Sequence, residues 1–286
     1  MSLRSNGEAI TRTEGTGVRR LLIVAVTLLS GLIPAAGNAQ LADGDTVTIV
    51  SGTLKLKGLL WRPVSDTPVP AVLFHHGGGC ADVSEAPRTL GRRFAARGYA
   101  FLWLYRRGAG ASRGQGECAF AQIPRVRTDQ GDEAALKLQL ELLTTTELAD
   151  AMAGLAALRT IPGIDPARIA VAGHSVGGQL AMLTAERDST LRAVLNLAGA
   201  AGVWSRSAEL RARLLQSLPR ITVPVYLAYA TDDNAAPGRA LGAELARLGK
   251  THQLEIYSSG GHNFVFSATH ASDPDIFRFL AAHLLR

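Results

Sequence analysis

The chain has few cysteines and no apolar run long enough for a typical membrane span. Its 286 residues include only 2 cysteines. The apolar run from Leu21 to Ile33 has 13 residues, whereas a transmembrane helix needs about 20. No cysteine follows this run, so we expect no lipid anchor there. The histidines lack the spacing of common zinc motifs, so we also expect no metal site.

Charge and composition point to one ordinary globular domain. The net charge of +6 is mild and spread along the chain, so we expect no nucleic-acid partner. Residues 40–286 contain no internal repeat, low-complexity tract or domain boundary. With 47% hydrophobic residues over the whole chain, this region can bury its own core, and we expect it to form a single domain.

The first 39 residues have the layout of a secretory signal peptide. Residues 1–20 carry four arginines, the apolar run follows, and Pro34 precedes the small residues from Ala35 to Ala39. This order predicts cleavage after Ala39, a secreted or periplasmic protein, and no stable membrane span after cleavage. The alternative is a membrane anchor, which the short apolar run disfavours.

Export would expose Cys80 and Cys118 to an oxidising compartment. Both cysteines fall in loops that follow predicted strands. The sequence therefore allows a Cys80–Cys118 disulfide, with two separate free thiols as the alternative.

Predicted strands alternate with predicted helices after an opening hairpin. This pattern favours a mainly parallel sheet covered by helices on both faces, with functional loops at the carboxyl ends of the strands. Residues 124–160 are helical in pattern, and Thr144 with Glu147 predicts a capping box that divides them into two helices. The predicted strands are 46–50, 54–61, 71–75, 99–104, 169–172, 193–198, 225–230 and 253–257.

The apolar strand at 169–172 leads directly into Gly173-His174-Ser175-Val176-Gly177. A G-x-S-x-G pattern between a strand and a helix is typical of a nucleophile elbow, in which the serine is held in strained geometry. Gly173 and Gly177 leave room for neighbouring backbone. We therefore predict Ser175 as a nucleophile, against the alternative of a chance surface turn.

A second glycine-rich loop, His76-Gly77-Gly78-Gly79, follows the strand at 71–75. Such a loop can supply an oxyanion donor, and the alternative is an ordinary flexible turn. We predict that the backbone N–H of Val176, with that of Gly77 or Gly78, binds the oxyanion.

A serine nucleophile needs a base, and the base needs a carboxylate. Asp232 and Asp233 follow the strand at 225–230, and His262 follows the strand at 253–257. The spacing leaves both aspartates open, and the one that is not the acid could cap the next helix. The alternative for His262 is a purely structural role in its turn.

Other segments border this predicted site. Arg106 and Arg107 lie in a third glycine-rich loop and could bind a substrate carboxylate, or be solvated or tied to neighbouring backbone. Residues 199–219, which carry Trp204, form the one obvious short lid. The helical region 124–160 is either part of the pocket wall or a surface helix.

Together these motifs resemble the α/β-hydrolase superfamily, in style closest to the dienelactone-hydrolase-like group. The resemblance covers nearly all of residues 46–286. It implies an α/β-hydrolase fold with a triad in the order Ser, Asp, His. Asp233 is the implied acid, because family members usually place it four residues before a proline, here Pro237. Dienelactone hydrolases proper carry cysteine where this chain has Ser175, which favours ester chemistry.

The expected function is a serine hydrolase that cleaves carboxylic esters through Ser175, His262 and Asp233. Its partner is then a small-molecule acyl substrate, and the mechanism needs no cofactor or metal. The alternatives are a serine peptidase or amidase, an acyltransferase, and a binding protein that has lost turnover.

Overall fold

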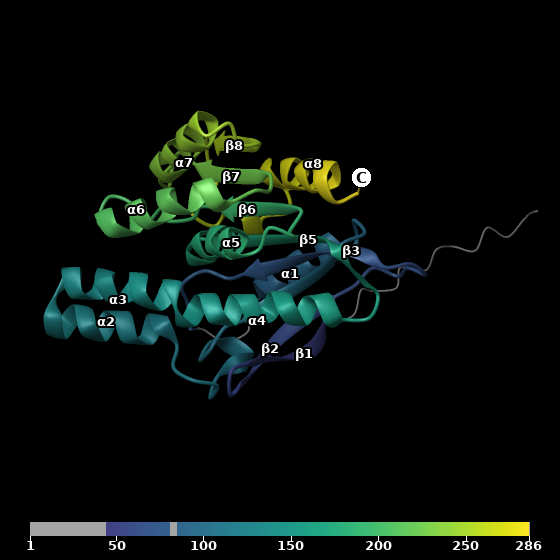
Figure 1. Ribbon diagram of the computed structural model, residues 1–286, viewed down its shortest axis with the longest axis horizontal. Coiled ribbons are helices and arrows are strands. Elements are labelled where there is room, and N and C mark those ends of the chain that lie inside the picture. The colour runs from purple at the N-terminus through teal and green to yellow at the C-terminus, as the bar shows by residue number, and fades with distance from the viewer. Residues whose placement is uncertain (1–43, 81–84, 286) are drawn as a thin grey trace, which may run out of the picture. The chain divides into compact units, whose positions relative to one another are not determined.

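The chain is built around an eight-stranded sheet (Figure 1). The computed structural model describes residues 44–80 and 85–285, so the predicted signal peptide at 1–39 lies outside the described residues. Within them, no helix is both long and apolar enough to cross a membrane. The strands are β1 (Asp45–Ser51), β2 (Leu54–Trp61), β3 (Val69–His75), β4 (Ala100–Tyr105), β5 (Ile164–His174), β6 (Ala193–Leu197), β7 (Val225–Ala230) and β8 (His252–Tyr257).

The sheet order is β1-β2-β4-β3-β5-β6-β7-β8. Strand β2 pairs antiparallel with β1 and β4, and the other pairings among the described strands are parallel. The central strands β3 and β4 are buried along their whole length, which is why they read as continuous apolar runs. The predicted, mainly parallel sheet is confirmed.

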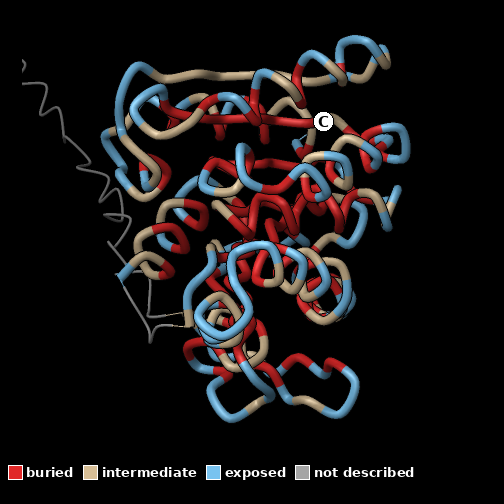
Figure 2. The backbone as a smooth tube through the Cα atoms, turned by 90° about the vertical axis from the view of Figure 1, so that its left-hand side faces the viewer, coloured by how far each residue is buried: buried red, intermediate tan, exposed pale blue. Residues whose placement is uncertain are grey.

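Helices cover both faces of this sheet, as expected. They are α1 (Glu85–Ala95), α2 (Ala119–Gln130), α3 (Asp132–Thr144), α4 (Thr146–Thr160), α5 (Val176–Arg187), α6 (Ala208–Ser217), α7 (Ala236–Arg247) and α8 (Ser272–Leu284), with short 3₁₀ turns at Gly110–Ser112, Leu218–Arg220 and Phe264–Phe266. Buried residues gather in the sheet and on the inner sides of the helices (Figure 2).

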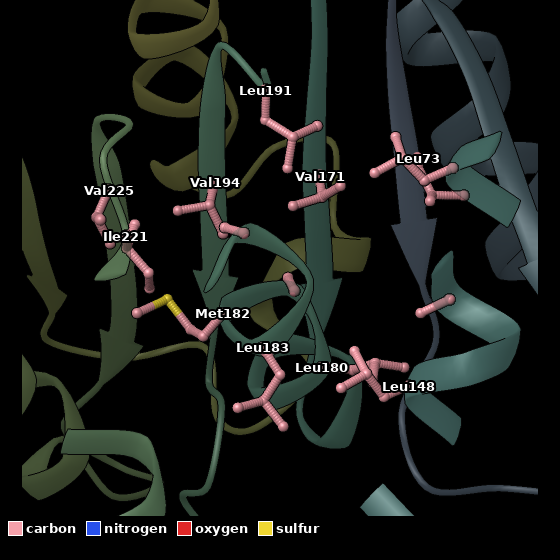
Figure 3. Packing of buried hydrophobic residues seen from close by; sticks show 14 of the residues in the cluster. Leu73, Leu148, Val171, Leu180, Met182, Leu183, Leu191, Val194, Ile221 and Val225 are labelled. Carbon is pink, nitrogen blue, oxygen red and sulfur yellow. The ribbon is translucent and has the colours of Figure 1, made fainter. Parts of the chain in front are cut away.

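Two apolar clusters lie on opposite sides of the sheet. Successive side chains of a strand alternate between faces, so Leu73 of β3 joins one cluster and Phe74 joins the other. Helices α4 to α7 contribute to the first cluster, and α1 and α8 to the second. Figure 3 shows part of the first cluster, which includes Leu180 and Met182 of α5 together with Val171 and Val194 of the sheet.

The helical region before β5 differs from the prediction. It forms three helices, α2, α3 and α4, because Gly131 adopts a left-handed φ of +91° and ends α2. The predicted capping box is wrong. The Thr144 hydroxyl donates to the Leu140 carbonyl, and the Glu147 carboxylate pairs with Arg106. Helices α2 and α3 lie side by side as a hairpin that extends beyond the sheet (Figure 1).

A disulfide joins Cys80, in the loop after β3, to Cys118, directly before α2. Of the two alternatives for these cysteines, the structure has the bonded pair. The sequence separation is 38 residues, and closing a loop of this size stabilises a folded chain by about 4 kcal/mol in the chain-entropy model. The disulfide therefore ties the base of the hairpin to the glycine-rich loop.

His75 ends β3 in a fully buried position. Neither of its ring nitrogens has a hydrogen-bond partner among the described residues. Burial, with a smaller effect of the Arg106 charge, lowers the pKa of His75 to about 3. The ring is thus neutral in the fold at neutral pH.

This buried ring predicts that acid destabilises the protein. Below the ordinary histidine pKa of 6.5 the unfolded chain takes up a proton that the folded His75 refuses until about pH 3. The free energy of unfolding should therefore fall as the pH falls through this window. Between pH 6 and pH 4, we expect the free energy of unfolding of His75→Leu to fall by about 2 to 3 kcal/mol less than that of the wild type. Urea unfolding at both pH values measures this, and equal losses in the two proteins would contradict it.

Candidate functional site

The site begins at the turn between β5 and α5. Ser175 occupies this turn with φ +57° and ψ −120°, a strained conformation for a residue with a side chain. The chain crosses itself closely on both sides. A Cβ on Gly173 would lie 2.0 Å from the Gly177 carbonyl oxygen, and a Cβ on Gly177 would lie 1.9 Å from that of His75. The structure therefore requires both glycines, as the sequence pattern predicts.

The structure brings Ser175, His262 and Asp233 into one hydrogen-bonded line. Nε2 of His262 lies 2.9 Å from Ser175 Oγ, and Nδ1 lies 2.7 Å from Asp233 Oδ2. A carboxylate can only accept, so Nδ1 carries the proton and Nε2 is free to accept from the serine hydroxyl. The three residues follow β5, β8 and β7, whose carboxyl ends meet at one edge of the sheet.

The neighbouring carboxylate, Asp232, has a different role. It accepts the backbone N–H groups of Gly260 and Gly261 at 3.0 and 2.8 Å. Both glycines have left-handed φ values, so Asp232 holds the bend that precedes His262. The helix-capping role considered for the second aspartate is wrong, because the amide of Ala236 at the start of α7 is bound by Asn234.

His174 also holds the histidine loop, a role that sequence reasoning missed. Its Nε2 lies 2.7 Å from the His262 carbonyl oxygen, to which it donates. Burial lowers the pKa of His174 to about 4, so the ring stays neutral at neutral pH. The position before the serine in G-x-S-x-G accepts many residues, so nothing in the pattern points to this contact.

The candidate oxyanion donors lie next to Ser175. Val176 is the first residue of α5, and intrahelical hydrogen bonding leaves its N–H open. Gly77 lies against the elbow, since a Cβ there would be 3.4 Å from Ser175 Cβ. Gly78 lies against the ring of Phe120, which a Cβ would meet at 2.5 Å. The loop therefore passes between the elbow and helix α2.

Arg106 sets the direction of this loop. Its side chain is 2% exposed, pairs with Glu147, and donates to the carbonyls of His76 and Gly77 at 2.9 and 3.1 Å. A trans peptide places its C=O and N–H on opposite sides. Binding both carbonyls to one guanidinium thus turns the N–H groups of Gly77 and Gly78 away from Arg106.

The next residue, Arg107, is also bound within the protein. It contacts the fully buried Asp150 at 2.7 Å, and Asp150 accepts from the Ser51 hydroxyl as well. Both arginines are thus tied inside the fold, and the substrate-carboxylate role considered for them has no support in their contacts.

Two cavities meet at Ser175 and Gly78. The aromatic cavity, about 360 Å³, is lined by His76, Gly77, Gly78, Gly79, Ala86, Pro87, Trp103, Tyr105, Ala109, His174, Ser175, His262, Asn263 and Phe266. The hairpin cavity, about 250 Å³, is lined by Gly78, Phe120, Ile123, Pro124, Arg127, Gln139, Ser175, Val176, Gln179, Ala200, Gly202 and Val203. A larger hollow of about 390 Å³ lies at the start of β3, away from the elbow.

The residues that line these cavities show which part of the predicted lid, residues 199–219, borders the site. Ala200 and Val203, at the start of 199–219, line the hairpin cavity. Helix α6 in the same segment packs into the core through Leu210 and Leu214. The α2–α3 hairpin supplies another part of the wall, from Phe120 to Gln139, so of the two alternatives for 124–160 its first part is pocket wall. Among the described residues, no cluster of His, Cys, Asp and Glu is placed to hold a metal ion.

Three known proteins share parts of this sequence or its fold. The quorum-quenching protein AidA of Acinetobacter baumannii (strain MDR-ZJ06) is 32% identical over 147 residues, which cover 51% of this chain and 40% of AidA. The chain therefore spans less than half the length of this curated relative.

Solved structures with this fold include hydrolases of two sizes. A protein of Klebsiella pneumoniae subsp. pneumoniae MGH 78578 described as a dienelactone hydrolase has a TM-score of 0.62 at 20% identity, covering 85% of this chain and 98% of that one. An acylaminoacyl peptidase of Pyrococcus horikoshii has a TM-score of 0.64 at 19% identity, covering 86% of this chain and 42% of that one. These likenesses establish the α/β-hydrolase fold.

The sequence model of one family agrees with this fold. It matches residues 56–275, a stretch that begins in β2 and contains the glycine-rich loop, the elbow, both aspartates and His262. Since the match covers most of the chain, the protein belongs to the dienelactone hydrolase family.

Proposed function

We propose that this chain is a serine hydrolase that cleaves carboxylic esters, with Ser175 as nucleophile, His262 as base and Asp233 as the acid that orients it. The observation that carries the proposal is the hydrogen-bonded line from Asp233 through His262 to Ser175 at a strained elbow. Membership of the dienelactone hydrolase family supports hydrolysis in general.

The geometry supports a two-step acyl transfer. Ser175 Oγ attacks the ester carbonyl while Nε2 of His262 takes its proton, and Asp233 stabilises the positive ring. When the intermediate collapses, His262 gives that proton to the leaving oxygen. Water, activated by the same ring, then releases the acid from Ser175.

The charge that forms on the carbonyl oxygen needs backbone donors. In this proposal the N–H of Val176 and that of Gly77 or Gly78 bind this oxygen, and one such donor typically lowers the barrier by about 3 kcal/mol. Arg106 acts at a distance by holding both glycine carbonyls, so it is a positioning residue.

The main alternative within this chemistry is amide or peptide hydrolysis. This alternative is suggested by the similar fold of the acylaminoacyl peptidase of Pyrococcus horikoshii, although the similarity covers only 42% of that chain. Esters come first because they need less leaving-group activation, and because serine replaces the cysteine of dienelactone hydrolases proper.

The first test uses p-nitrophenyl esters from acetate to octanoate. We expect the protein to hydrolyse at least the shorter members and Ser175→Ala to lose about 10⁴-fold or more in kcat. The matched control Ser65→Ala, in an exposed loop, should keep full activity. A fluorophosphonate probe should label the wild type at Ser175. Labelling without ester turnover would move the assignment to amide hydrolysis. The absence of both labelling and turnover would favour a binding protein.

The second test separates the two adjacent aspartates. Asp233→Asn should lower kcat by about 10⁴-fold, because the amide favours the wrong histidine tautomer. Asp232→Asn keeps one of the two acceptor oxygens that bind the glycine amides and leaves Asp233 in place, so its activity should stay within about tenfold of the wild type. Steady-state kinetics on the best ester measures both, and the reverse ranking would make Asp232 the acid.

A second candidate function follows from the quorum-quenching relative. In this role the same site would inactivate a bacterial signal molecule. Medium containing such a signal, incubated with the protein, should lose its effect on a quorum-sensing reporter strain, and medium incubated with Ser175→Ala should not. Equal reporter output in both arms would remove this candidate.

A further inference from the structure

We propose that the hairpin cavity receives the acyl part of the substrate, and that Gln179 selects acyl groups with an N–H or O–H donor close to the scissile carbonyl. This inference rests on the proposed function. It adds a specificity-determining residue and the class of acyl group that the site accepts.

The position of His262 assigns the two cavities. Of these two cavities, His262 lines the aromatic one and Val176 lines the hairpin one. The ring that protonates the leaving oxygen must lie beside the leaving group. The leaving group therefore occupies the aromatic cavity, and the acyl group extends the other way, along the start of α5.

Gln179 lies one helical turn beyond Ser175 on this path. Its backbone N–H donates to the Ser175 carbonyl at 3.3 Å. The two residues are four apart in the sequence, the spacing at which side chains of a helix share a face. The residue is 2% exposed and lines the hairpin cavity. Its Oε1 is buried and has no hydrogen-bond partner among the described residues.

A buried acceptor without a donor is costly. A ligand donor removes that cost when the side-chain amide of Gln179 turns its oxygen toward the cavity that the residue lines. Phe120, Ile123 and Val203 make much of the cavity near Gln179 apolar. Gln139 of α3 adds a second side-chain amide to the lining. Arg127 lines the cavity too, but it pairs with Asp132 at 2.9 Å. These contacts fit a short, mainly apolar acyl group with one N–H or O–H donor.

The aromatic cavity fits a different group. Trp103, Tyr105 and Phe266 contribute rings to its lining. A flat, apolar leaving group buries more surface there than a small alkoxide does. The favoured substrate is therefore an ester with a donor on the acyl side and an apolar, ring-containing leaving group.

The test compares two p-nitrophenyl esters that differ in one group. The N-acetylglycine ester has an N–H where the 4-oxopentanoate ester has a CH₂. We expect the wild type to prefer the N–H ester in kcat/KM, and Gln179→Met to lower this preference at least about fivefold, because methionine keeps the shape but cannot accept. Dividing the variant's ratio by that of the wild type cancels the intrinsic reactivity of the esters.

Three further measurements make this assignment specific. A 3-hydroxybutanoate and butanoate pair distinguishes an O–H donor from an N–H donor. Gln253→Met, the same substitution on β8, should keep the wild-type ratios. Phe266→Leu should lower the preference for phenyl over methyl esters and leave the acyl preference unchanged, the opposite of the pattern for Gln179→Met.

The outcomes separate this inference from the proposed function. If wild type and Gln179→Met hydrolyse the esters with the same acyl preference, the inference is wrong and the esterase assignment stands. If Gln179→Met changes the leaving-group preference instead, the two cavities are assigned the wrong way round. If fluorophosphonate labels Ser175 but no ester turns over, the same acyl pairs are compared as anilides. An equal acyl preference of wild type and Gln179→Met on these amides would overturn the inference. No labelling and no turnover would overturn function and inference together.

Discussion

The site depends on one close approach, that of the first turn of α5 to the end of β3. The contact leaves no room for a side chain at Gly177, where a Cβ would lie 1.9 Å from the His75 carbonyl oxygen. At Gly173, near the end of β5, a Cβ would lie 2.0 Å from the Gly177 carbonyl oxygen. Because these backbones touch, Ser175 is held in a left-handed conformation, above the sheet edge and beside the glycine-rich loop. The serine, the open amide of Val176 and the loop that carries Gly77 therefore occupy one small volume.

The loops around this volume are held by buried polar groups as well as by the apolar core. Arg106 binds two carbonyls of the glycine-rich loop, His174 binds the His262 carbonyl, and Asp232 binds two amides before His262. Each anchor satisfies backbone groups that a loop leaves without ladder partners. The result is a site whose reacting groups are positioned by neighbours that need not touch the substrate.

The α2–α3 hairpin gives the fold its second cavity. The disulfide connects Cys80, three residues beyond Gly77, to the start of α2, and Phe120 in α2 contacts Gly78. The wall of the hairpin cavity and the candidate oxyanion loop are thus joined covalently and by packing. The shape of the proposed acyl cavity therefore depends on the position of the hairpin, which extends beyond the sheet in Figure 1.

The strands, their mainly parallel arrangement and the elbow can be predicted from the sequence alone, because they follow from local signals. Apolar runs mark strands buried on both faces, and the glycines around Ser175 mark a turn with no space for side chains. Which of Asp232 and Asp233 faces His262 depends on the folded chain, because neighbouring residues at a strand end point in different directions. The tertiary structure also decided the partners of Arg106, His174 and Cys80, which lie 29 to 88 residues away along the chain. Contacts between residues so far apart leave no periodic trace in a single sequence, since they depend on how whole elements pack.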